Sequence, residues 1–176
     1  MSRGAGVLAE TQAGPHHHPA HGRDSVQPAQ SRGAQVAQRA PAPVVRRGVI
    51  EVPVTVIEDR PGGLRNFQIC ALSSAEMRAA LDHAVREGHV ATTIVGHSFE
   101  LANRAGTAPN RVHVARFEAL CALLAARREM LPTVHFADRP ALALGRDDRP
   151  LGPSRLRLHW RQAEQLWSNL VAERAA

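Results

Sequence analysis

Short β-branched segments alternate with two helical segments between residues 49 and 136, and this alternation limits the possible folds more than any other feature. The three strand candidates are residues 49–57, 92–95 and 133–136. The order strand–helix–strand–helix–strand implies parallel pairing with right-handed crossovers. We therefore predict an α/β fold, which is either a partial (β/α) barrel or part of a doubly wound sheet.

Both helical segments carry signals for where they begin and end. In the first, Ser73 and Glu76 form a capping box, and Gly88 is suited to terminate the helix. The second begins after Asn110, a favourable N-cap residue, and Pro132 closes it. Apolar residues at helical spacing predict one buried face on each helix. These are Met77, Ala80, Leu81 and Ala84 in the first helix, and Val114, Phe117, Leu120, Cys121 and Leu124 in the second.

The first strand candidate has a weak point. Pro53 removes one backbone donor, so we expect an edge position or a bulge there. Residues 59–63 then read as a loop, and the apolar residues 67–72 lead into the first helix. The two cysteines, Cys70 and Cys121, are isolated and lack metal-ligand spacing, which favours small buried hydrophobes.

Residues 1–47 differ from the rest in being rich in Gly, Pro, Gln, Ala and His, without a helical or strand period. Such a segment does not bury enough apolar surface to offset its ordering entropy, so we predict a disordered tail. The tail contains His16, His17, His18 and His21. These side chains could hold Zn, Ni or Cu loosely, and a solvated low-complexity tract is the competing interpretation.

Residues 141–176 are predicted to be a linker followed by an amphipathic helix that opens near Ser154. One stripe of this helix consists of Leu156, Trp160, Ala163, Trp167 and Leu170. Such a stripe normally docks on its own domain. The alternative is a helix that binds a groove of another protein or forms a dimer.

The basic charge does not indicate nucleic-acid binding. The net charge is +6, but every basic residue is arginine, and the residue types with AT-rich codons are scarce, which points to a GC-rich bacterial genome. From Val49 onward the sequence has 16 arginines and 14 acidic residues, so the charges nearly balance there. There is also no tyrosine for base stacking. No apolar run approaches the roughly 20 residues that span a bilayer, and the start lacks a secretory signal. We expect a cytoplasmic protein that binds neither nucleic acid nor membrane.

His97 is the candidate catalytic residue. The β-branched run at residues 92–95 reads as a buried strand that stops at Gly96, directly before this histidine. In α/β folds the carboxyl ends of parallel strands face the active site, and histidine exchanges protons near neutral pH. The alternative is a satisfied polar residue at a strand end.

The segment 48–140 resembles the C-terminal part of the polysaccharide deacetylase family. Three stretches carry the resemblance: GVIEVPVT at 48–55, IVGHSFEL at 94–101 and NRVHVARFEALC at 110–121. The resemblance implies a distorted α/β barrel and a metal-dependent hydrolase that removes acetyl groups from N-acetylated polysaccharides or oligosaccharides. It also implies a divalent metal, usually zinc, bound by an aspartate and two histidines, with a second aspartate as base. His97 matches the general acid of the last motif.

The rest of the family pattern is missing from this chain. There is no Asp-Asp-Gly strand end, no arginine motif, and no His-Ser/Thr-x-x-His-Pro metal motif; His17 and His21 share its offset, but Gly22 follows where proline is expected. We therefore expect a truncated or frameshifted portion that is inactive alone. The alternative functions are a non-enzymatic protein that binds a partner through Trp160 and Trp167, and a weak metal-buffering tail. The sequence predicts no oligomeric state.

Overall fold

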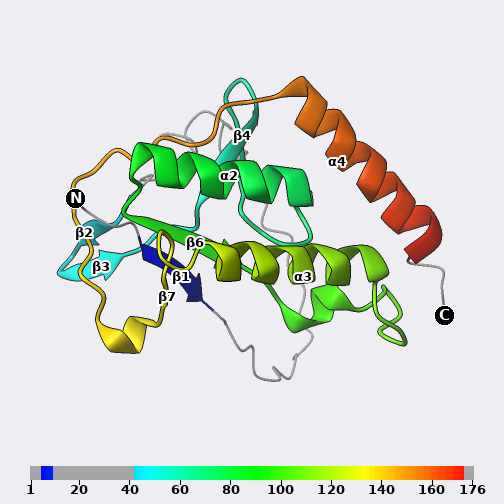
Figure 1. Ribbon diagram of the computed structural model, residues 1–176, viewed down its shortest axis with the longest axis horizontal. Coiled ribbons are helices and arrows are strands. Elements are labelled where there is room, and N and C mark those ends of the chain that lie inside the picture. The colour runs from blue at the N-terminus through cyan, green and yellow to red at the C-terminus, as the bar shows by residue number, and fades with distance from the viewer. Residues whose placement is uncertain (1–4, 10–41, 173–176) are drawn as a thin grey trace, which may run out of the picture.

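Three parallel strands form the sheet on which the candidate site is built (Figure 1). The computed structural model describes residues 5–9 and 42–172. The strand order is β6 (Ala91–Val95), β1 (Ala5–Ala9), β7 (Thr133–Val134). β1 pairs in parallel with both neighbours, so β6 and β7 run in the same direction, as predicted.

The central position of β1 corrects part of the prediction of a disordered tail over residues 1–47, namely at residues 5–9. Residues 5–9 form a strand whose backbone is paired on both edges, and residues 44–46 belong to a second strand. Local composition does not reveal this, because the partners of β1 lie far along the chain. Residues 1–4 and 10–41 of this tail lie outside the described residues.

The predicted strand over residues 49–57 is not continuous. Its first part is β3 (Val49–Glu51), which forms a hairpin with β2 (Val44–Arg46). Arg47 and Gly48 both have positive φ in the connecting turn, the conformation that two-residue hairpins favour. The chain leaves this hairpin at residues 52–55, around Pro53, and re-enters a strand as β4 (Val56–Arg60). β4 pairs with β5 (Gly63–Asn66), so the predicted loop is a tight turn.

Helix α2 (Ser74–Glu87) forms as its signals predict. The Ser73 hydroxyl accepts from the Glu76 backbone, the Glu76 carboxylate accepts from the Ser73 backbone, and Gly88 adopts the left-handed conformation. Its predicted apolar face is buried. The core combines that face with the 67–72 segment, β6 and α3 (Arg111–Ala126). The fully buried members include Phe67, Leu72, Met77 and Leu81.

The predicted face of α3 is partly wrong. Asn110 caps the helix and Leu120 is buried, but Phe117 and Cys121 are exposed. The buried stripe is rotated and contains two polar residues. Its members are His113, Arg116, Leu120 and Leu123. Arg116 and His113 have hydrogen-bonding partners in the interior, which sequence hydrophobicity does not reveal.

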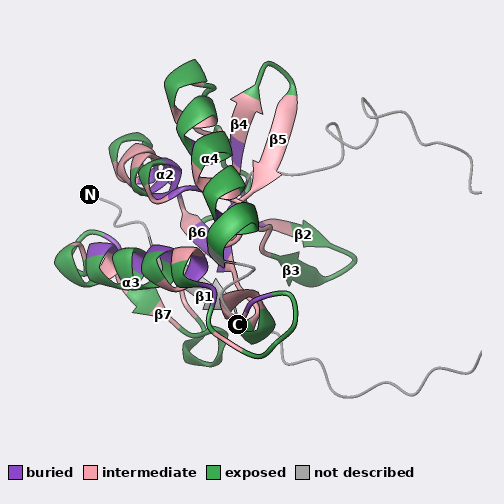
Figure 2. Ribbon diagram, turned by 90° about the vertical axis from the view of Figure 1, so that its right-hand side faces the viewer, coloured by how far each residue is buried: buried purple, intermediate pink, exposed green. Residues whose placement is uncertain are grey.

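The chain ends in α4 (Arg155–Trp167), which begins after Ser154 as predicted and continues into a π-helical turn at Ser168–Ala172. Figure 2 shows this helix on the outside of the molecule, with most of its surface exposed and no other helix or strand over its outer side. The linker 141–152 contains no regular element.

The described residues thus contain three α-helices and small sheets, which confirms mixed α/β content. Within 5–9 and 42–172 the strands do not close into a barrel. None of the described helices is both long and apolar enough to cross a membrane.

Candidate functional site

Helix α4 packs on the domain through charged and polar side chains. The Arg161 guanidinium, almost fully buried, donates to the Glu76 carboxylate at 3.0 Å and to the Asp59 carboxylate at 3.2 Å. Asp59 also accepts from Arg65 at 2.9 Å. One arginine of α4 is therefore tied to both α2 and β4. This network fixes which face of the helix points inward.

A second ion pair holds the middle of α4. Arg116, which is only 2% exposed, donates from two nitrogens to the Glu164 carboxylate at 2.8 and 3.0 Å. Its third nitrogen donates to the Cys70 carbonyl at 3.2 Å. The other oxygen of Glu164 accepts from the Trp160 indole at 2.7 Å. Burying a charged pair is costly unless its geometry and extra hydrogen bonds are good, and both conditions hold here.

The last contact between this C-terminal helix and the rest of the domain joins two uncharged side chains. Ser168 is fully buried, and its hydroxyl accepts from the Asn110 amide at 3.1 Å. Asn110 also caps α3 by accepting from Val112 and His113. Arg161, Glu164 and Ser168 follow a helical spacing of three and four residues. The stripe of α4 that docks on the domain is therefore polar.

The apolar face of α4 points to solvent, which corrects the expectation that it docks on its own domain. We use this name for Leu156, Trp160, Ala163, Trp167 and Leu170. Leu156 is 81% exposed, Trp160 59%, Trp167 62% and Leu170 52%. Ala163 is also exposed. A contiguous apolar surface rimmed by polar residues is typical of an interaction site.

The rim of this face carries positive charge. Arg155 and Arg157 lie in the first turn of α4, which contains no acidic residue. The Arg157 guanidinium donates to the Gly152 carbonyl at 2.8 Å. Because Glu164 is paired with Arg116, its charge is offset. The outer side of α4 is therefore apolar with a basic amino-terminal end.

His97 lies where the sequence places it, two residues after the end of β6 and at the carboxyl edge of the parallel sheet. It is half-buried, and its ring stacks on Phe99 with centroids 5.1 Å apart. The residue before it is Gly96, and a side chain there would crowd the core, because a Cβ on Gly96 would lie 2.9 Å from the Ile69 side chain. His97 is therefore accessible and set against an exposed aromatic ring.

Glu100 connects the segments around His97. Its carboxylate accepts from the Gln68 amide and from the His97 backbone, the latter at 3.5 Å. Its carbonyl lies 2.7 Å from His113 Nδ1, so that nitrogen donates. His113 Nε2 is buried without a hydrogen-bond partner among the described residues. Sequence reasoning missed Glu100 and His113, although both lie within the stretches that resemble deacetylases.

An open pocket of about 470 Å³ adjoins this group, and Cys70, Glu100, Asn103 and His113 line part of it. Burial, together with the Glu100 carboxylate, raises the pKa of the Cys70 thiol to about 11. A protonated thiol is a poor nucleophile. Cys121 is exposed, which corrects the expectation that it is buried. Neither cysteine is positioned as a reactive thiolate in this pocket.

The described residues do not fit the metal that the resemblance implies. Among the described residues, no group of three or more His, Cys, Asp or Glu could hold a metal ion. The His16–His21 tract lies outside the described residues. We therefore derive no reaction step through a metal.

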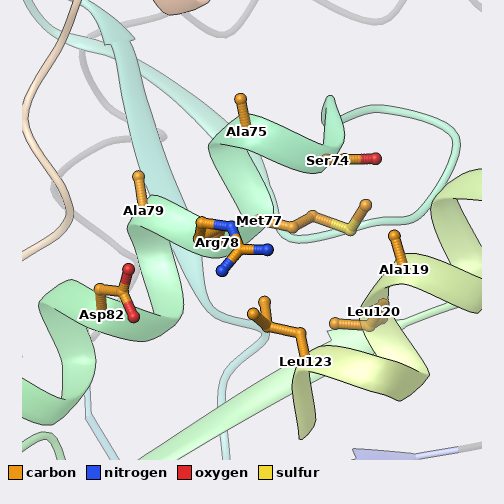
Figure 3. Close-up of a pocket in the computed structure, with 9 residues that line it drawn as sticks. All are labelled: Ser74, Ala75, Met77, Arg78, Ala79, Asp82, Ala119, Leu120 and Leu123. Carbon is orange, nitrogen blue, oxygen red and sulfur yellow. The ribbon is translucent and has the colours of Figure 1, made fainter. Parts of the chain in front are cut away.

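A second depression lies between α2 and α3, with a volume of about 410 Å³. Figure 3 shows Met77 from α2 and Leu120 and Leu123 from α3 reaching toward one another in it. Asp82 on its rim is paired with Arg127 at 2.7 Å. The apolar side chains of this groove belong to the core, and its rim carboxylate is already paired with an arginine.

Comparisons of this chain with protein families, with curated proteins and with solved structures returned no match. The resemblance to polysaccharide deacetylases therefore rests on the residues quoted above.

Proposed function

We propose that this protein binds another protein surface through the apolar face of α4. The supporting observation is the reversed orientation of the helix: its polar stripe is buried in ion pairs, and two tryptophans face solvent. Tryptophan is among the residues that contribute most to protein interfaces. The Trp160 indole donor is already satisfied by Glu164, so covering this ring leaves no unpaired N–H.

The ion pairs make the face a preorganised one. Arg161 and Glu164 connect α4 to three other elements, so the helix does not have to be ordered when a partner binds. Binding by a rigid surface avoids part of the entropy cost of association. The function proposed here requires no catalytic group.

Gel filtration of the labelled full chain, alone and in extract of the producing organism, tests this proposal. The wild type should elute in a complex larger than its 19.0 kDa, and the Trp160→Gln/Trp167→Gln variant should elute as a monomer. Leu144→Gln is the matched control, since Leu144 is an exposed apolar residue outside α4. A wild type that stays monomeric in every condition, with both indoles fully quenched by acrylamide, contradicts the proposal.

A second candidate function follows from the position of His97. We propose that His97 is the general acid of a deacetylase-type (β/α) barrel and donates a proton to the amine that leaves an N-acetylated sugar. Its support is a half-buried imidazole at the carboxyl edge of a parallel sheet, stacked on exposed Phe99. The metal and base motifs of that family do not occur in this sequence, so the chain alone should release no acetate.

Binding tests this second candidate separately from turnover. Titration of the full chain with N-acetylglucosamine oligomers should shift the NMR resonances of the His97 ring, and Phe99→Ala should weaken the shift. Translation of the upstream DNA in three frames should show an Asp-Asp-Gly strand end and a His-x-x-x-His-Pro motif. Unchanged His97 resonances at millimolar oligosaccharide, or an upstream region without both motifs, would count against a deacetylase.

A further inference from the structure

We infer that the occupant of the apolar face of α4 is the same face of a second copy of this chain, paired antiparallel about a twofold axis near Ala163. This inference rests on the proposed function of that face and names its partner. It follows from three observations: the order of side chains, their spacing, and the charge at the helix ends.

The order of side chains along the face is the same in both directions. From Leu156 to Leu170 it reads Leu, Trp, Ala, Trp, Leu. In a twofold interface the same surface of both copies meets. If one residue of the first copy contacts a second residue of the other copy, the reverse contact also forms. With Ala163 near the axis, each Ala163 lies opposite its own counterpart. Trp160 of each helix then lies opposite Trp167 of the other, and Leu156 lies opposite Leu170. Similar side chains therefore face each other across the axis.

The spacing is that of a paired helix. The five residues are separated by four, three, four and three positions, which is the alternation that helices packed as coiled coils use. The face extends over about 21 Å, from the helical rise of about 1.5 Å per residue. All five residues are exposed in the single chain, and Figure 2 shows no other described helix or strand over the outer side of α4.

The charge at the helix ends selects the antiparallel direction. Arg155 and Arg157 lie in the first turn of α4, where the positive end of the helix dipole disfavours cations. An antiparallel neighbour places the negative carboxyl end of its own helix beside these arginines. A parallel neighbour would bring four arginines and two positive helix ends together. The second copy therefore offsets an electrostatic cost that the single chain bears.

Sedimentation and light scattering of the full chain test the pairing, with tryptophan emission as a second signal. Both tryptophans of the chain lie on this face. We expect a mass of twice 19.0 kDa and an emission maximum that shifts to shorter wavelength as the concentration rises. Ala163→Arg should give a monomer with red-shifted emission. Gln162→Arg, which introduces the same charged side chain one position away and off the face, should leave the dimer intact.

The direction is tested by cross-linking in a Cys121→Ser background. Mixed Leu156→Cys and Leu170→Cys chains should form disulfide dimers much faster than either variant alone. A dimer that survives Ala163→Arg, or one that cross-links Leu156→Cys to itself, would overturn the inference.

The outcomes also separate this inference from the proposed function. A monomeric wild type whose Trp emission shifts on adding a purified protein captured from extract overturns the second copy and leaves α4 as a binding face. A shift only with anionic phospholipid vesicles overturns both and assigns the face to a membrane surface. A monomer whose emission never shifts also overturns both.

Discussion

The Arg161 guanidinium donates to the Glu76 carboxylate at 3.0 Å across 85 residues of sequence, and Glu76 is at the same time the capping-box residue of α2. One carboxylate thus orders the start of α2 and holds α4 in place. Glu76 is 2% exposed, so both interactions are shielded from water.

Arg161→Met should lower the free energy of unfolding by about 3 kcal/mol, since removing one partner of a buried ion pair leaves an uncompensated charge. The carboxylates of Glu76 and Asp59 would be the groups left behind. Chemical denaturation measures the loss, and faster proteolysis in the linker 141–152 should report release of α4. Arg155→Met, at an exposed position of the same helix, should change stability by less than about 0.5 kcal/mol. Equal losses of stability in both variants would show that the ion pairs of Arg161 do not stabilise the fold.

Ser73→Ala should cost about 1 kcal/mol, because its hydroxyl caps α2 and the loss of a cap has this typical magnitude. The neighbouring Ser74→Ala is the control, since no capping bond depends on Ser74. Thermal unfolding of the two variants provides the comparison. A Ser73→Ala variant as stable as Ser74→Ala would contradict the capping role.

Acidification should destabilise the fold through His89. Burial lowers the pKa of His89, and the nearby His83 acts in the same direction, whereas Asp148, Glu87 and the Arg149 carbonyl oppose the shift. The unfolded chain binds a proton near pH 6.5 and the folded chain resists it, so stability is complete above about 6.5 and falls toward the lowered pKa.

Denaturation at a series of pH values measures this effect. His89→Gln should flatten the decline below pH 6.5, and His159→Gln, at an exposed position on α4, should not. A His89→Gln profile that follows the wild type would assign the acid sensitivity to other groups.

The two thiols should react at very different rates. Cys121 is exposed, whereas the pKa of Cys70 is raised to about 11 by burial and by Glu100. A disulfide reagent at pH 8 should modify one thiol quickly, and Cys121→Ser should remove the fast phase. Glu100→Gln should speed the slow phase, since it removes the charge that disfavours the thiolate. A fast phase that persists in Cys121→Ser would refute this assignment.

Sequence reasoning was correct where the signals are local. Ser73, Glu76 and Gly88 define α2 within one segment, and the β-branched run of β6 leads directly to His97. It was wrong about the orientation of α4. A helix with an apolar stripe normally buries that stripe, but here the charged partners of Arg161 and Glu164 lie on distant segments.

The same reason explains the remaining differences. Arg116 is polar by type yet buried, because Glu164 and the Cys70 carbonyl satisfy it. The composition of residues 5–9 does not by itself predict a strand. These residues form β1 because they pair with β6 and β7. Glu100 was missed as a connecting residue because its partners, Gln68 and His113, come from separate segments.

The position of β1 also governs the order in which the chain can assemble. Ala5 pairs with Ala91, and Gly6 pairs with Thr133, so a ribosome must extend the chain past residue 133 before the first strand made has both neighbours. Contacts between residues so far apart in sequence slow folding, because a long loop must close first. Helix α2 and the two hairpins draw on near neighbours and can form during synthesis. The pairing of β1 in the middle of the sheet is therefore expected to form last.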